Sequence, residues 1–269
     1  MGCPVNAYGL RLIRASLFIR VAAMGYVFDT TDAVAYDRWL TNPRNRFPRI
    51  QHRLMVDMLK PNRGDTLLSI GCGTGSSLLP LQEMGVSVTG LDPSTPMLDI
   101  ARRRLGSRVD LHQGYAEDLP FDDNAFTYSC LITALEFVDD PKTALAEACR
   151  VTKDRLFIGV FNRYAIKGIQ RRIAGIFKRS IYSHARFYSV WQVRKAVRTL
   201  AGPVPVTWRT ACLFPRPGRL TRRLEESGLI QRCPFGEYAG LVATLVPRYR
   251  TRPLSLKVSS NRVTELAAG

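Results

Sequence analysis

The chain has 269 residues, 46% of them apolar, and a net charge of +17, so it is long and apolar enough to fill the core of one large domain. Its six cysteines form no C-x-x-C pair, which argues against a disulfide framework and a zinc site, and no metal is expected. No run of about 18 uncharged apolar residues occurs, so no transmembrane helix is predicted. We therefore expect a cytoplasmic protein, with peripheral attachment to the inner membrane face as an alternative.

The first 25 residues form an N-terminal extension that we expect to lie outside the native domain. Arg20 interrupts their apolar stretch and no convincing cleavage site follows, so a signal peptide is not expected. Recognisable domain sequence begins at Tyr26, and Met24 is therefore the expected natural start. The core domain is predicted over residues 26–161.

Apolar runs of strand length alternate with helix-like stretches from residue 65 to residue 160. This order predicts an α/β fold of the doubly wound, Rossmann-like kind, with a mostly parallel sheet and helices on both faces. The last helix of the series has Asp140 as its N-cap and Pro141 as its first residue. The expected strands are 66–70, 87–91, 109–113, 126–133 and 156–161, and the expected helices are 76–84, 97–105 and 141–151.

A glycine-rich turn joins the first strand to the first helix, with the sequence Ser69-Ile70-Gly71-Cys72-Gly73-Thr74-Gly75. Glycine lets a backbone turn tightly and approach a ligand closely, and the helix that follows offers unpaired N–H groups. The third glycine comes one residue earlier than in the dinucleotide pattern G-x-G-x-x-G, whose last position is Ser76 here. The spacing therefore favours S-adenosylmethionine (SAM) over NAD, with a tight turn that binds nothing as the alternative.

Acidic residues follow the next two strands. Asp92 ends the second strand, where a carboxylate can accept hydrogen bonds from both ribose hydroxyls, although it could instead cap the helix that starts near Thr95. After the third strand, Asp118 is expected to accept from the adenine amino group while Leu119 packs on the ring. A plain surface turn explains Asp118 equally well.

The excess of positive charge is confined to one segment. From Arg155 to Leu224 there are 16 Lys and Arg and no Asp or Glu, whereas an ordinary solvated face mixes both signs. Within it, residues 162–203 are predicted as a basic helical cap or lid, because isoleucines recur at helical spacing over 164–182 with basic residues between them. The pattern indicates an anionic partner such as an anionic membrane surface. A lid with a solvated charged face is the alternative.

The rest of the chain is expected to add strands and then a loose tail. Strand-like runs at 204–213 and 239–246 flank an expected helix at 218–227, and residues 204–247 are predicted to complete the sheet. Residues 248–269 are polar and aperiodic, which is typical of a loose tail.

The stretch from Tyr36 to about Asn162 resembles the class I SAM-dependent methyltransferases, and most of all the type 11 methyltransferase domain, the group that holds the ubiquinone and menaquinone biosynthesis enzymes. The resemblance implies a seven-stranded sheet, SAM as methyl donor and S-adenosylhomocysteine (SAH) as product. Ser69 stands where the family usually has an acid that holds the methionine amino group, so a SAM-fold protein without catalysis is an alternative. The implied cofactor contacts are Tyr36, Ser69, Gly71, Cys72, Gly73, Gly75, Asp92, Pro93, Met97, Glu117, Asp118, Leu119 and Leu131.

No catalytic residue is assigned, because the methyl group of SAM is already activated and alignment with the acceptor supplies much of the rate. Neither an Asn-Pro-Pro-Tyr-like run nor a Pro-Cys nucleophile is present, which favours an anionic small-molecule, lipid-like or quinone-like acceptor over nucleic acid. RNA-directed methylation with the basic segment is the alternative. Acceptor contacts are expected after the fourth and fifth strands and in the basic segment, at Glu136, Asn162, Arg163, Tyr164, His184, Arg186 and Tyr188.

Overall fold

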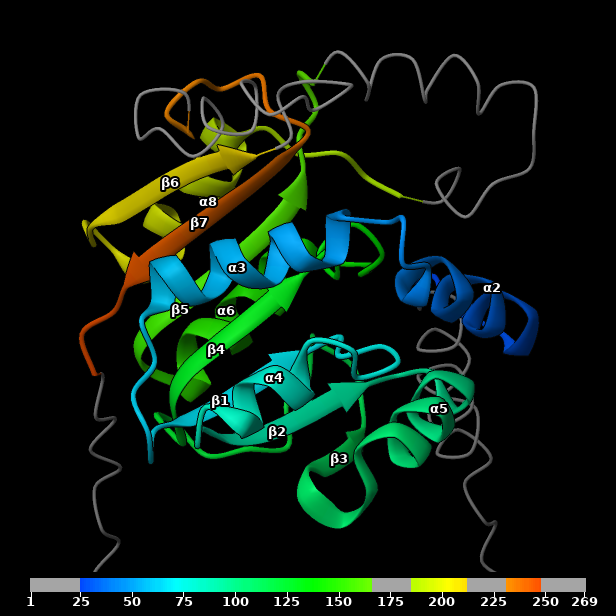
Figure 1. The fold of residues 1–269 in the computed structure, drawn as a ribbon. Coiled ribbons are helices and arrows are strands. Elements are labelled where there is room, and N and C mark those ends of the chain that lie inside the picture. The colour runs from blue at the N-terminus through cyan, green and yellow to red at the C-terminus, as the bar shows by residue number, and fades with distance from the viewer. Residues whose placement is uncertain (1–24, 166–184, 212–230, 248–269) are drawn as a thin grey trace, which may run out of the picture.

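The computed structural model describes residues 25–165, 185–211 and 231–247 (Figure 1). In these residues a seven-stranded sheet has the order β3-β2-β1-β4-β5-β7-β6. Strands β1 to β5 are parallel, whereas β7 pairs antiparallel with both β5 and β6, which confirms the predicted Rossmann-like, mostly parallel sheet. The strands are β1 (Thr66–Ile70), β2 (Ser87–Asp92), β3 (Asp110–Gln113), β4 (Phe126–Ile132), β5 (Thr152–Phe161), β6 (Val206–Ala211) and β7 (Tyr238–Thr244).

Helices cover both faces of the sheet (Figure 1). Helices α3, α4 and α5 pack on one face and α6 and α8 on the other, so each face has its own apolar core. Leu67 and Leu68 of β1 belong to opposite cores, because successive side chains of a strand point to opposite faces. The helices are α2 (Thr30–Thr41), α3 (Phe47–Leu59), α4 (Leu78–Glu83), α5 (Thr95–Leu105), α6 (Pro141–Val151) and α8 (Val190–Ala201), with a 3-10 turn at Gly106–Arg108.

Capping side chains fix where α5, α6 and α8 begin. Ser94 accepts a hydrogen bond from the Met97 N–H at the start of α5, and Ser189 and Gln192 form a capping box at the start of α8. At α6 the Asp140 side chain accepts from the Lys142 N–H and Pro141 is the first residue, which confirms the predicted start of this helix.

Strand β5 is longer than the sequence predicts. It begins at Thr152, directly after α6, and not at residue 156. The charged residues Asp154 and Arg155 suggest a turn, but Arg155 pairs with Thr244 of β7 and its guanidinium lies 5.5 Å from the ring centre of Tyr128. Tertiary contacts that no local pattern shows therefore extend this strand.

The prediction of a lid over residues 162–203 is wrong for the part that forms α8. Helix α8 buries Val190, Val193 and Val197 in the core beside α6, so it belongs to the layers of the sheet and is not a lid. The strands predicted within 204–247 are present as β6 and β7.

Several predictions fall outside the described residues. These are the N-terminal extension up to residue 24, the amphipathic helix from residue 166 onward, the helix at 218–227 and the tail at 248–269. Among the described residues, no helix is long and apolar enough to span a bilayer, and no three His, Cys, Asp or Glu side chains are grouped to hold a metal ion.

Candidate active site

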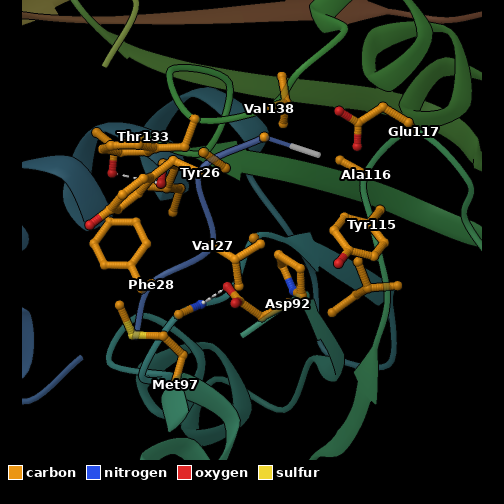
Figure 2. A pocket seen from close by; sticks show the side chains of 18 of the residues that line it. Tyr26, Val27, Phe28, Asp92, Met97, Tyr115, Ala116, Glu117, Thr133 and Val138 are labelled. Carbon is orange, nitrogen blue, oxygen red and sulfur yellow. Dashed lines mark hydrogen bonds between the residues drawn. The ribbon is translucent and has the colours of Figure 1, made fainter. Parts of the chain in front are cut away.

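A cavity of about 740 Å³, including its open mouth, lies at the carboxyl ends of β1, β2 and β4 (Figure 2). In Figure 2 Asp92 and Met97 lie on one side of it and Tyr115, Ala116 and Glu117 along another. The lining residues are Gly25, Tyr26, Val27, Phe28, Tyr36, Gly71, Gly73, Leu91, Asp92, Pro93, Met97, Tyr115, Ala116, Glu117, Ile132, Thr133, Ala134, Phe137 and Val138.

The glycine-rich turn brings backbone to the wall of this cavity. Gly71 has a φ of +70°, and a Cβ at this position would lie 2.5 Å from the Cβ of Ala134, so only glycine fits. Gly73 has a φ of +54°, and a Cβ there would meet only the Tyr36 ring, at 3.8 Å. The space above Gly73 is therefore open to a ligand that approaches the main chain.

Asp92 points into the cavity from the end of β2. It is 7% exposed, and its two oxygens accept hydrogen bonds from the N–H groups of Gly73 at 2.8 Å and Ser94 at 2.9 Å. Burial raises the pKa of Asp92, and these two N–H groups oppose the rise. Each carboxylate oxygen can accept more than one hydrogen bond, so Asp92 can still receive hydroxyl donors from a ligand. Ser94, and not Asp92, is the N-cap of α5.

The segment Tyr26–Phe28 lines and covers the cavity, a role that no pattern in the sequence predicts. The Tyr26 N–H donates to the Phe137 carbonyl at 3.0 Å, and the Ser94 hydroxyl donates to the Phe28 carbonyl at 2.7 Å. The Phe28 ring lies 5.8 Å from that of Tyr36 and 5.1 Å from that of Phe137, measured between ring centres. Gly25, which was predicted to belong to the N-terminal extension, also lines the cavity.

Seven of the predicted cofactor contacts line the cavity, namely Tyr36, Gly71, Gly73, Asp92, Pro93, Met97 and Glu117. Four others are buried beside it. Leu131 faces the core next to α6, so the following residue, Ile132, lines the cavity in its place. Ser69 is 2% exposed within β1, and Cys72 and Gly75 pack against other parts of the domain, Cys72 beside Gly90 and Gly75 beside Leu105.

The two predicted adenine contacts are displaced from the cavity. Asp118 is exposed, and Leu119 is 3% exposed and packs into the core beside α6. The Leu119 N–H donates to Glu147 at 3.0 Å and its carbonyl accepts from Arg150 at 3.0 Å, which turns this part of the loop away. The residues that line the cavity here are Tyr115, Ala116 and Glu117.

Three acceptor candidates lie together at the end of β4, behind the cavity wall. Glu136 is buried, and burial raises its pKa to about 8. The Arg186 N–H donates to the Glu136 carbonyl at 2.9 Å, and the Tyr188 hydroxyl donates to the Leu135 carbonyl at 3.4 Å. Burial and the Glu136 charge raise the pKa of Tyr188 to about 12.

The other acceptor candidates lie elsewhere. Asn162 is 1% exposed and donates to the carbonyls of Pro234 and Gly236 at 2.6 and 2.8 Å. Its side chain therefore fixes the backbone of the residues that precede β7. Arg163 and Tyr164 are exposed, and the Tyr164 ring lies 5.9 Å from that of Trp191. His184 lies outside the described residues.

Comparison with known proteins identifies the family of this chain. A family model described as "Methyltransferase domain" matches residues 68–157. The chain is 37% identical over 142 residues to a demethylmenaquinone methyltransferase of Renibacterium salmoninarum, a match that covers 52% of this chain and 58% of that protein. The chain spans about half the length of the curated relatives it matches. The chain belongs to the class I SAM-dependent methyltransferases.

Two further matches cover more of this chain. An uncharacterized protein of Methanocaldococcus jannaschii, MJ1123, is 32% identical over 180 residues, which are 65% of this chain and 80% of that protein. A crystal structure from Thermotoga maritima, described as a SAM-dependent methyltransferase and possible histamine N-methyltransferase, is 27% identical with a TM-score of 0.62, and the match covers 80% of this chain and 96% of that one.

Proposed function

We propose that the protein transfers a methyl group from SAM to a small-molecule acceptor of lipid-like or quinone-like character. The observation that carries this proposal is the cavity where Asp92 and the open backbone of Gly73 face one another, at the carboxyl ends of β1 and β2. In open α/β sheets ligands bind at this edge. Membership of the methyltransferase family supplies the identity of the ligand.

The residues of the cavity fit the parts of SAM. Asp92 would accept the ribose hydroxyls, the turn at Gly71 and Gly73 would receive the methionine portion, and Tyr115 to Glu117 would surround the adenine. When bound, SAM supplies a methyl group already activated on a sulfonium. The Tyr26–Phe28 segment excludes water from one side, which favours an in-line transfer to a second ligand.

The nature of the acceptor is supported by the curated relatives and by the aromatic rings near the cavity. The relatives are called demethylmenaquinone methyltransferases, and four partly exposed or buried rings follow one another from Tyr36 through Trp39 and Phe47 to Phe161. Such rings suit a planar apolar molecule. Reduced demethylmenaquinone is therefore the first acceptor to test.

A direct test measures transfer of a labelled methyl group from SAM to reduced demethylmenaquinone, and to the metabolites of a lysate if that acceptor fails. The proposal predicts a labelled apolar product that the Asp92→Ala variant makes at least about tenfold more slowly at limiting SAM. Asp118→Ala is the matched control, because Asp118 is an exposed acid that does not line the cavity. Binding of SAM without any labelled product from either source would support the SAM-fold protein without catalysis.

Peripheral attachment to an anionic membrane is a second part of this proposal. Trp191, Lys195 and Arg198 are exposed on one face of α8, at spacings of four and three residues, and Tyr164 lies against Trp191. Tryptophan and tyrosine favour the membrane interface, and Lys and Arg favour anionic lipid. This surface would bring an apolar acceptor within reach of the protein.

A further inference from the structure

A buried carboxyl group lies just outside the cavity, after the end of β4. Glu136 is 1% exposed and stands between Ala134 and Phe137, which both line the cavity. Its Oε1 atom accepts a hydrogen bond from the Phe161 N–H at 2.7 Å, whereas its Oε2 atom is buried without a hydrogen-bond partner among the described residues. A buried carboxyl oxygen without a partner costs free energy, so such an atom calls for an explanation.

The backbone around this carboxyl group is tied to the segment before α8. The Glu136 carbonyl accepts from the Arg186 N–H, and the Leu135 carbonyl accepts from the Tyr188 hydroxyl. The Phe161 N–H holds the Oε1 atom of the same carboxyl group. The side chain is therefore held in place with one oxygen free.

The titratable and charged groups around Glu136 connect it to the cavity. They are Tyr188 and Arg186 from the segment before α8, and Tyr238 from β7. Burial and the Glu136 charge raise the pKa of the Tyr238 hydroxyl well above its usual value, and the nearby Tyr36 adds to this rise. Tyr36 lines the cavity, so Tyr238 lies within electrostatic range of both the cavity wall and Glu136.

Aromatic rings run alongside these polar groups. Tyr36 stacks on Trp39 with ring centres 5.8 Å apart, Trp39 is 5.9 Å from Phe47, and Phe47 is 5.3 Å from Phe161 and 5.6 Å from Tyr238. Tyr36, Trp39 and Phe47 are only partly buried. Apolar rings next to a few fixed polar groups suit a flat acceptor that carries a hydroxyl group at one end.

We propose that Glu136 is the proton acceptor of the reaction and that its free Oε2 atom receives the proton of a ring hydroxyl on the acceptor. This inference rests on the proposed function. The acceptor O–H bond breaks and its proton passes to Oε2. The electron pair it leaves forms the new bond to the methyl carbon, from the oxygen or from a conjugated ring carbon, while the electron pair of the broken S–C bond remains on the sulfur of SAH. When a ring carbon takes the methyl group, that carbon then loses its own proton to water and the ring oxygen regains the proton held on Oε2. When the oxygen takes the methyl group, Oε2 releases its proton to solvent.

A role of Glu136 in the reaction also affects the binding of SAM and SAH, which can be measured without a methyl acceptor. SAM carries a positive sulfonium and SAH a neutral sulfur, so an ionised carboxylate that faces the reaction centre attracts SAM and not SAH. Burial raises the pKa of Glu136 to about 8, so the group ionises as the pH rises through this value. The ratio of SAM affinity to SAH affinity must therefore increase with pH, and groups common to both ligands cancel in the ratio.

The experiment is calorimetric titration of the protein with SAM and with SAH at about pH 6.5 and about pH 9, on the parent, Glu136→Gln and Asp118→Asn. The amide oxygen of Glu136→Gln can still accept from the Phe161 N–H, and Asp118→Asn removes an exposed acid outside the site. We expect the affinity ratio to rise about fivefold between the two pH values in the parent and in Asp118→Asn, and to stay level in Glu136→Gln.

The outcomes separate this inference from the proposed function. A level ratio in the parent, or the same rise in folded Glu136→Gln, overturns the role of Glu136 while SAM binding stands. Failure of the parent to bind either SAM or SAH overturns the proposed function itself. If Glu136→Gln does not fold, a level affinity ratio in the parent still overturns the role of Glu136.

Discussion

The Asp92 carboxylate accepts a hydrogen bond from the Gly73 N–H at 2.8 Å, so the acid that ends β2 also holds the glycine-rich turn that follows β1. Its other oxygen accepts from the Ser94 N–H, at the N-cap of α5. The strand end, the turn and the helix start are thereby joined through one side chain. A ligand that binds Asp92 is placed against all three.

Replacing Asp92 by Ala should therefore affect both binding and stability. The variant loses the ribose contacts, which should weaken SAH binding at least about tenfold, and it leaves two backbone N–H groups without their acceptor, which should cost about 1–3 kcal/mol of unfolding free energy. Calorimetry and urea unfolding measure the two effects. Asp118→Ala should change neither, and a folded Asp92→Ala with unchanged SAH affinity would place the ribose elsewhere.

Glycine at position 71 should be needed for space as well as for backbone conformation. In Gly71→Ala the new Cβ meets the Ala134 Cβ at 2.5 Å with φ at +70°, so we expect a loss of about 2–4 kcal/mol and weaker SAH binding. Gly64→Ala is the matched control, because Gly64 also has a positive φ, +89°, but nothing lies within 4 Å of its Cβ. It should lose about 1 kcal/mol and keep its SAH affinity. Equal effects in urea unfolding of the two variants would contradict the close approach at Ala134.

The Phe28 ring should keep the Tyr26–Phe28 segment packed over the cavity. Phe28→Ala removes its contacts with Tyr26, Tyr36 and Phe137, so we expect SAH affinity to fall about tenfold through faster dissociation. Stopped-flow displacement of SAH measures the rate. Val34→Ala, at a 47% exposed position on α2, should dissociate SAH like the parent. A dissociation rate that Phe28→Ala leaves unchanged would show that the segment does not cover the bound ligand.

The exposed face of α8 should support binding to anionic membranes. We expect the protein to sediment with phosphatidylglycerol vesicles but not with phosphatidylcholine vesicles, and the Lys195→Glu, Arg198→Glu double variant to lose most of this binding. Lys153→Glu reverses an exposed charge at the start of β5, outside α8, and, although it changes one charge where the double variant changes two, should keep binding. If the parent stays in the supernatant with anionic vesicles at low salt, the exposed face of α8 does not bind anionic membranes.

The sequence predicts those parts of the site that depend on local pattern. Gly71 and Asp92 lie at strand ends, where the change from an apolar run to a glycine or an acid is visible in the chain itself. The structure places both on the cavity, and the parallel pairing of β1 to β5 agrees with the same alternation of strands and helices.

Other parts of the site depend on contacts between distant residues. Asp118 and Leu119 follow β3 as predicted, but Glu147 and Arg150 of α6 bind the loop and turn Leu119 into the core. The Tyr26–Phe28 cover has no periodic pattern, since it is an extended segment held by single hydrogen bonds. The position of Glu136 after β4 is visible in the sequence, but its burial and its free oxygen are not.

The central claim is that the cavity binds SAM and its product. The measurement that tests it most directly is the thermal unfolding of the protein with and without SAH. A ligand that binds only the native state adds roughly 2.7 kcal/mol at 100 times its dissociation constant, so saturating SAH should raise the Tm by several degrees, whereas NADH should not. A transition that SAM, SAH and the analogue sinefungin all leave unmoved would contradict the account.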